Sequence, residues 1–247
     1  MIIQLTDTHL LADPRQLFKG INPYDHLARV IEQIRGLAPQ LVLVTGDLVH
    51  DDSAQGYRNL LGLLQTLPCP VRCLPGNHDA VPLMQSILAT DQVNCQSLIE
   101  YGDWLCVLLD SSQPGQVGGR LGAERLHDLE RVLNNHPGRD VIVAMHHPLL
   151  PCGSRWLDQQ RVADAAAVWP LLLNAPCRVR AVVSGHIHQE FATEHLGIAV
   201  YGTPATAVQF RVHSADYALD DGLPAYRWLR PGPGGRLTSG IVRLNQF

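Results

Sequence analysis

Potential metal ligands gather in five short clusters along this sequence of 247 residues. The clusters are Asp7-Thr8-His9, Gly46-Asp47, Gly76-Asn77-His78-Asp79, His146-His147 and Gly185-His186-Ile187-His188. Imidazole nitrogens combined with carboxylate and amide oxygens suit iron, manganese, zinc or cobalt. None of the six cysteines falls in a cluster, which argues against a closed structural zinc site. We therefore expect a metal centre that is open to chemistry.

Each cluster alone also has an ordinary structural explanation. Gly46-Asp47 fits a turn that ends a strand, because glycine and aspartate favour turn conformations. His147 by itself fits a hydrogen-bonded structural histidine. The ordered set is harder to explain in this way, and its mixture of ligands suits two ions. In binuclear sites the ions lie about 3.5–4 Å apart, and a carboxylate is the natural bridge, so the set predicts a binuclear centre.

A short apolar segment, typical of a buried strand, precedes every cluster. The expected strands are Ile2–Thr6, Leu41–Thr45, Pro70–Leu74, Val141–Met145 and Arg178–Val183. In open α/β sheets, side chains that follow separate strands converge at the edge formed by the carboxyl ends of the strands. The spacing therefore predicts that the five clusters meet at one such edge.

Helix-like segments separate these strands, and a fold of the α/β class follows from the alternation. Asn22 and Ser53 are expected to cap the first two helices, of which the first covers Pro23–Leu37. A third helix is expected near Ala123–Asn134. A fourth, around Val162–Asn174, contains Pro170, where we expect a break.

The pattern changes after about residue 197, where strands follow one another without helices. They are expected at Ile198–Tyr201, Thr206–Val212, Ala225–Leu229 and Leu237–Leu244. We expect a mixed or antiparallel sheet there. No linker or repeat divides the chain, so we predict one domain, 1–247, with a β-rich extension from about 206 to 247.

Composition argues against several kinds of partner. The formal net charge is −4 and the sequence has no block of like charges, so we expect neither a nucleic-acid-binding nor a membrane-binding protein. The N-terminus lacks the features of a signal peptide, and no segment has the apolar length needed to span a bilayer. Scattered cysteines then suggest reduced thiols and a cytoplasmic location.

The ordered clusters resemble those of the calcineurin-like metallophosphoesterase superfamily, and the resemblance covers residues 1–211. It implies an α/β/β/α sandwich of two mixed sheets flanked by helices. It also implies that three residues bind a first metal, three bind a second and one bridges both. In that order, the residues are Asp7, His9 and His188, then Asn77, His146 and His186, and finally Asp47. The resemblance favours His146 over His147 as the ligand.

The same resemblance places His78 off the metals, near the substrate phosphate, as the catalytic residue. Asn77, His78 and His188 are the expected substrate contacts. The metals would generate hydroxide from a bridging water near neutral pH, and this hydroxide would attack phosphorus. His78 would then stabilise the phosphoryl oxygens or protonate the leaving alkoxide. For Asp79 we favour a helix-capping role over one of orienting His78.

Several loops resemble those of class III, bacterial 3′,5′-cyclic AMP phosphodiesterases more closely. The matching stretches are Leu109-Asp110-Ser111, Gly118–Gly122, His146–Leu149, Trp156-Leu157-Asp158, Gly185–Gln189, Gly202–Thr206 and Val208-Gln209-Phe210. The resemblance implies hydrolysis of cyclic AMP to AMP with two metal ions, iron or manganese first and zinc or cobalt next. Trp156, Phe210 and Arg120 would lie near the nucleoside, or else serve only packing and solvation.

Two other functions stay open from the sequence. A broad-specificity phosphodiesterase acting on glycerophosphodiesters would use the same metal ligands. A scaffold with the same fold would lack some of them, whereas every expected ligand is present here. Protein phosphatase activity is disfavoured because the third cluster ends in Asp79 where those enzymes have glutamate. The resemblance implies a possible homodimer, because relatives often dimerise, but nothing in the composition decides the oligomeric state.

Overall fold

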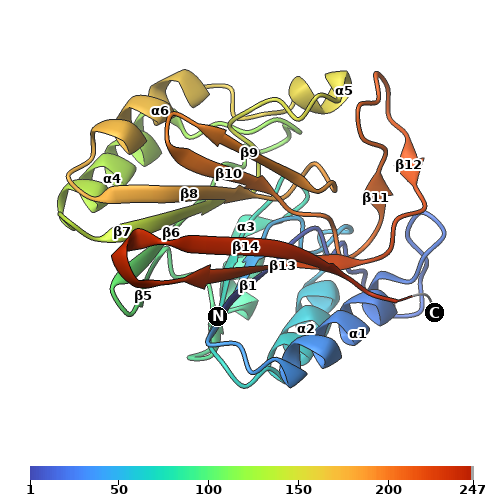
Figure 1. The fold of residues 1–247 in the computed structure, drawn as a ribbon. Helices are drawn as coiled ribbons and strands as arrows, with labels where there is room; N and C mark the ends of the chain where they lie inside the picture. The colour runs from blue at the N-terminus through green and yellow to red at the C-terminus, as the bar shows by residue number, and fades with distance from the viewer. Residues whose placement is uncertain (246–247) are drawn as a thin grey trace.

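A computed structural model describes residues 1–245, and most of its strands form two six-stranded sheets (Figure 1). The first sheet contains β14 (Leu237–Arg243), β13 (Ala225–Pro231), β1 (Ile2–Leu5), β2 (Leu41–Thr45), β3 (Val71–Leu74) and β4 (Val93–Asn94), in that spatial order. The strands from β1 to β4 are parallel, whereas β13 runs antiparallel to β1 and β14 antiparallel to β13. The strands at the end of the chain therefore extend the sheet that its first strand begins.

The second sheet contains β5 (Leu98–Tyr101), β6 (Trp104–Leu109), β7 (Asp140–Met145), β8 (Arg178–Ser184), β10 (Ile198–Gly202) and β9 (Phe191–His195), in that order. Here β6, β7, β8 and β10 are parallel, and the two edge strands are antiparallel to their neighbours. A small separate pair is formed by β11 (Gln209–Phe210) and β12 (Leu219–Asp220). The sequence predicts a strand at 206–212, but only Gln209 and Phe210 of this range form a strand, which pairs with β12.

Helices cover the outer face of each sheet. They are α1 (Pro23–Gly36), α2 (Ala54–Leu64) and α3 (Val81–Ile87) on the first sheet, and α4 (Gly122–Asn134) and α6 (Ala165–Asn174) on the second. A short α5 (Arg155–Asp158) and a 3₁₀ turn at Pro233–Gly235 complete the described elements. Figure 1 shows α1 and α2 on one side of the molecule and α4 and α6 on the other, with the sheets between them.

The two sheets pack face to face through a third apolar layer. Ile2, Leu43 and Leu229 of the first sheet meet Ile142 and Val183 of the second, and all five are buried. Burial of apolar surface on both faces explains why Leu41–Val44 of β2 and Val141–Met145 of β7 are continuous apolar runs rather than alternating ones. In β1 one buried polar residue, Gln4, interrupts the run. The predicted α/β/β/α sandwich is confirmed.

The ends of α1 follow from its sequence. The side-chain oxygen of Asn22 accepts hydrogen bonds from the backbone N–H groups of Tyr24 and Asp25, at 2.9 and 3.1 Å, so this predicted cap is confirmed. Ser53 caps α2 through the N–H of Gly56, as expected. In α1 and α2, a side chain thus accepts hydrogen bonds from backbone N–H groups of the first turn, which have no partner within the helix.

The break expected at Pro170 is wrong. The helix α6 begins at Ala165 and continues through Pro170 to Asn174. Proline removes the hydrogen bond to the carbonyl of Ala166. Both residues lie on the exposed face of the helix, where water can bond to that carbonyl.

No helix within residues 1–245 is long and apolar enough to cross a membrane. The predicted extension from 206 reaches residue 247, and its last two residues lie outside the described part of the chain.

Candidate metal centre

The five predicted clusters all lie in loops that directly follow strands. Asp7 and His9 follow β1, Asp47 follows β2, and Asn77 follows β3 in the first sheet. His146 follows β7, and His186 and His188 follow β8 in the second sheet. Apart from Asp7 and His146, these residues line a single cavity of about 220 Å³. The two sheets thus deliver their side chains to one shared site.

Four of the donors converge tightly. The ligand atoms of Asp7, His9, Asp47 and His188 all lie within 4.8 Å of one another, and the four side chains are buried. Nε2 of His9 lies 3.3 Å from Nε2 of His188 and 3.7 Å from Oδ2 of Asp47. Nε2 of His188 also lies 3.0 Å from Oδ1 of Asp7. A single cation at this point would contact donors from three loops.

A second group lies on the other side of Asp47. Nε2 of His146 is 3.3 Å from Oδ1 of Asp47. His146 and His186 also belong to a second cluster of potential ligand atoms within 4.8 Å, together with His147. The side-chain oxygen of Asn77 is buried and has no hydrogen-bond partner among the described residues. Asp47 therefore offers one oxygen toward each group, which suits a bridging ligand.

Hydrogen bonds on the far side of the rings leave one bare nitrogen on several histidines. Nδ1 of His146 donates to the carbonyl of Thr45 at 2.9 Å, and Nδ1 of His188 donates to the carbonyl of Val208 at 2.7 Å. Nε2 of His186 donates to the side-chain oxygen of Gln160 at 3.2 Å. Metal-binding histidines characteristically donate their second N–H in this way, because the bond fixes the tautomer and the ring.

His147 differs from its neighbour because both of its ring nitrogens have partners. Nε2 donates to the carbonyl of Val117 at 3.0 Å, and Nδ1 accepts from the hydroxyl of Ser111 at 2.8 Å. Burial lowers the pKa of His147 to about 3, so the ring is neutral. This geometry favours His146 over His147 as a ligand.

The backbone at the cluster is unusual. Asp7, His9, Asp47, His186 and His188 all have positive φ angles, between 45° and 66°. The left-handed region costs a non-glycine residue about 1–2 kcal/mol. Strained conformations of this kind concentrate at functional sites, where surrounding structure holds them in place. The strain here falls on five of the seven expected ligands.

Residues 1–190 match the family model described as calcineurin-like phosphoesterase. The chain belongs to the calcineurin-like phosphoesterase family. This confirms the family resemblance carried by the five clusters.

Curated relatives in this family align with nearly the whole chain. The 3′,5′-cyclic adenosine monophosphate phosphodiesterase CpdA of Pseudomonas aeruginosa is 35% identical, with 99% of this chain and 90% of the relative covered. CpdA of Escherichia coli strain K12 is 35% identical over 98% of this chain and 89% of the relative. A 3′,5′-cyclic-nucleotide phosphodiesterase of Nostoc is 34% identical, with 98% of this chain and 92% of the relative covered.

More distant solved structures share the fold of this family. A dimetal phosphatase from Danio rerio superposes with a TM-score of 0.68 at 15% identity, covering 98% of both chains. A purple acid phosphatase from yellow lupin superposes with a TM-score of 0.67 at 12% identity, covering 98% of this chain and 53% of the lupin chain. These likenesses concern the fold alone.

The donor set of this family member fits metal ions. Oδ1 of Asp7, Oδ1 of Asn77 and Nε2 of His146 are buried without a hydrogen-bond partner among residues 1–245. In addition, Oδ1 of Asp7 and Nε2 of His188 are two acceptors that face each other at 3.0 Å. Such an arrangement is costly unless a cation lies between the atoms.

Electrostatics point in the same direction. Burial raises the pKa of Asp47, but the neighbouring His146 outweighs it and holds this pKa well below its usual range. Burial lowers the pKa of His146, yet Asp47 outweighs that effect and raises it to about 9. The pair therefore attracts a positive charge, which a metal ion can supply in place of the proton.

Asp79 does not cap the helix that follows it, and the favoured prediction for this residue is wrong. No side chain caps α3. The Asp79 carboxylate instead accepts hydrogen bonds from the backbone N–H groups of Gly76, Leu48 and Val49, at 2.8–3.2 Å, and from the hydroxyl of Tyr57 at 2.9 Å. It joins the loop that carries Asp47 to the loop that carries Asn77.

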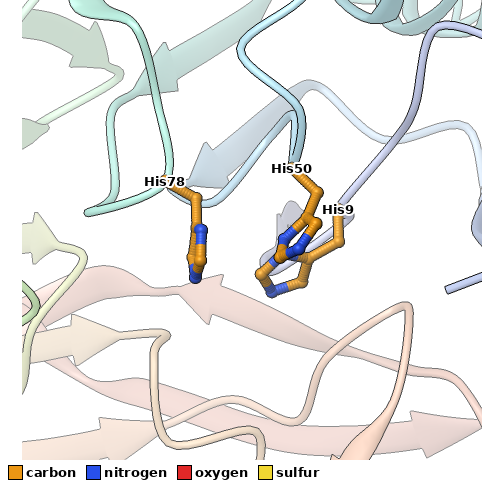
Figure 2. A group of neighbouring side chains, drawn as sticks. All are labelled: His9, His50 and His78. Atoms are coloured by element: carbon orange, nitrogen blue, oxygen red, sulfur yellow. The ribbon is translucent and has the colours of Figure 1, made fainter. Parts of the chain in front are cut away.

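The sequence interpretation missed His50. Its Nδ1 lies 3.3 Å from Nδ1 of His9, and its ring lies 4.7 Å from that of His78. Figure 2 shows the side chains of His9, His50 and His78 extending side by side from three separate loops. His78 donates its backbone N–H to Oδ1 of Asp47, and its ring lines the cavity.

The wall of the cavity is largely aromatic. Trp156 and Phe210, which the cyclic-nucleotide resemblance placed near the nucleoside, both line it, with ring centroids 5.0 Å apart. Arg120 does not line it; its side chain is 60% exposed and lies 3.8 Å from Asp164. Phe18, Lys19, Gln160 and Tyr217 also line the cavity, and no sequence motif had singled them out.

Proposed function

We propose that this protein is a metal-dependent phosphodiesterase that hydrolyses 3′,5′-cyclic nucleotides, cyclic AMP first, to the 5′-monophosphate. The observation that carries the proposal is the convergence of donors from five loops at the floor of an aromatic cavity. The named activities of the aligned relatives support it, because those alignments span 98–99% of this chain.

In this proposal Asp7, His9 and His188 would hold one ion, Asn77, His146 and His186 would hold a second, and Asp47 would be the ligand that both share. Mixed nitrogen and oxygen donors suit iron or manganese, with zinc and cobalt as further candidates. When bound, two such ions offset the charge on phosphoryl oxygens and lower the pKa of water from 15.7 to about 7. Both aspartates stay ionised because nearby histidines outweigh burial and lower the pKa of each carboxyl.

The chain itself contributes orientation and a proton. We assign His78 as the catalytic residue, because its ring lines the cavity beside His9 and makes no hydrogen bond within the described residues. Water attacks phosphorus and gives up one proton to solvent, the bond from phosphorus to O3′ breaks, and His78 supplies a proton to O3′ and regains one from solvent. Asn77 and His188 lie beside the same floor and would contact the phosphoryl oxygens.

The deciding experiment is a measurement of kcat/KM for cyclic AMP with manganese-reconstituted protein, beside a chelated control. We expect chelator-sensitive formation of 5′-AMP. Folded protein with two metal ions per chain, verified by elemental analysis, that turns over glycerophosphocholine but not cyclic AMP would overturn the proposal in favour of the glycerophosphodiesterase.

We place this activity in the cytoplasm. All six cysteines are unpaired in the structure, and five are buried. A reducing compartment keeps such thiols in this state.

A further inference from the structure

Lys19 is the only lysine in the chain, since the other 18 of its 19 basic residues are arginines. It is also the only lysine or arginine among the described residues that line the cavity. No carboxylate within residues 1–245 lies close enough to pair with it; Asp216, beside Tyr217, approaches Arg155 instead. Lys19 therefore brings an uncompensated positive charge to the mouth of the site.

The backbone holds Lys19 in an unusual position. Phe18 and Ile21 exchange both backbone hydrogen bonds, at 2.8 and 3.1 Å, and close a two-residue turn over Lys19 and Gly20. Both turn residues have positive φ angles, 51° and 89°. Such turns favour asparagine, aspartate or glycine at the first position. Turn propensity therefore does not explain a lysine here.

The side chain of Lys19 completes a ring of contacts around the mouth. Phe18 stacks on His9 with centroids 4.9 Å apart, and Phe210 stacks on His188 at 4.0 Å. The centroids of Phe210 and Tyr217 are 5.5 Å apart. Nζ of Lys19 lies 5.5 Å from the Tyr217 ring and 6.0 Å from the Phe18 ring, so it joins the two aromatic sides.

This arrangement provides different binding groups for the phosphate and for the rest of a substrate. The buried donors at the floor would take the phosphate, so the rest of the molecule must extend toward the exposed mouth. Aromatic faces there suit stacking of a nucleobase. An ammonium group offers three donors to the acceptor nitrogens on the edge of a purine. The same positive charge would repel the trimethylammonium group of glycerophosphocholine.

We propose that Lys19 is a substrate-binding residue that recognises the nucleobase edge, an inference that rests on the proposed function. It makes this chain select cyclic nucleotides over phosphodiesters that lack a base or carry a cationic head group. The recognition acts on binding of the nucleoside and not on the chemistry at phosphorus.

The first test compares Lys19→Met with wild type on two substrates: cyclic AMP and ribose 3′,5′-cyclic phosphate, which has the same cyclic diester without the base. We expect the loss of kcat/KM on cyclic AMP to exceed the loss on the base-free diester about tenfold, mainly through KM. Lys19→Arg should recover part of the difference. Arg15→Met removes a charge from the same loop, where the side chain is 89% exposed and pairs only with Asp13, and should behave as wild type. Equal losses on both substrates, or no loss on either, would overturn the inference.

The second test needs no turnover and so separates this inference from the proposed function. Lys19 carries the only side-chain amine, so an amine-selective reagent modifies one side chain, which peptide mass spectrometry distinguishes from the N-terminus. We expect 5′-AMP to slow its modification, and ribose 5-phosphate at the same concentration to slow it far less. Equal protection by both would contradict a role in base recognition, whereas a wild-type protein without cyclic AMP hydrolysis would contradict only the proposed function.

Discussion

Gly76 lies directly against the carboxylate of Asp47. A Cβ atom at Gly76 would overlap Oδ1 and the backbone nitrogen of Asp47 and lie 2.9 Å from its Cγ. The two residues follow neighbouring strands, β3 and β2, whose pairing brings the loops together. Because Asp47 faces both groups of potential ligands, the space left by Gly76 fixes the position of the bridging carboxylate.

The first prediction is that Gly76→Ala displaces Asp47 and lowers kcat/KM by about 100-fold or more, because a shift of about 1 Å at a reacting centre costs that much. Overpacking should also lower the free energy of unfolding by about 1–3 kcal/mol. Gly62→Ala is the control, since Gly62 lies on the exposed face of α2 with open space around it and should gain stability. Steady-state kinetics, elemental analysis and urea denaturation check both variants. Wild-type kinetics and metal content in Gly76→Ala would show that Asp47 tolerates the shift.

Asn77→Ala is predicted to deplete one of the two ions. The buried amide oxygen of Asn77 has no hydrogen-bond partner within the described residues, and the methyl group of alanine cannot replace it as a metal ligand. We expect elemental analysis to fall from two ions per chain toward one, with a loss of about 100-fold or more in kcat/KM. The exposed Asn174→Ala, at the end of α6, serves as the control. Full metal content with unchanged turnover would sink the ligand assignment.

His78→Ala is predicted to keep both ions and lower kcat by about 10²–10⁴-fold, the contribution of a positioned acid. The backbone N–H of residue 78 would still bond to Asp47, so the loop should stay in place. Elemental analysis and single-turnover kinetics give the result. Loss of metal in this variant would instead make His78 a ligand.

Most of the fold, and the positions of the candidate ligand clusters after the strands, could be predicted from the sequence because both rest on local signals. The strands β1, β2 and β7 are almost entirely apolar, with Gln4 as the one polar residue inside β1, and each is followed by a polar cluster. Parallel pairing then carries these clusters to one edge. The caps of α1 and α2 follow from Asn22 and Ser53 in the same local way.

His50 could not be found in this way, because long-range backbone contacts bring it to the site. Leu10 and Val49 form an isolated parallel bridge, and the N–H of His50 donates to the carbonyl of Leu10 at 2.8 Å. These contacts place residues 47–50 alongside residues 7–10. Neither stretch has a strand-like pattern, so the sequence gives no sign of the pairing.

Asp79 shows the same limit for a residue that a motif did contain. Its place before a helix favoured a capping role, but its carboxylate accepts hydrogen bonds from three donors in other segments and from Gly76 of its own loop. Burial, and next the charge of Asp47, raise the pKa of Asp79 to about 7. Tertiary structure decided the role of this side chain.

The last prediction concerns stability away from the site. Oδ1 of Asp140 accepts hydrogen bonds from Nε of Arg178 at 2.9 Å and Nε of Arg180 at 2.7 Å, across the paired strands β7 and β8. The bond from Arg178 lowers the pKa of Asp140, so ionised Asp140 stabilises the folded state. That contribution is present above the unfolded pKa of about 3.9 and is lost as pH falls through the lower folded pKa. Asp140→Asn should therefore reduce the free energy of unfolding by about 2 kcal/mol at pH 7, allowing for the exposure of both arginines. In urea denaturation, the difference in free energy of unfolding between Asp140→Asn and wild type should become smaller as the pH falls from 7 toward 3.5. The exposed Asp221→Asn should match wild type at both pH values. A gap that stays constant with pH would mean that Asp140 acts through packing rather than through its charge.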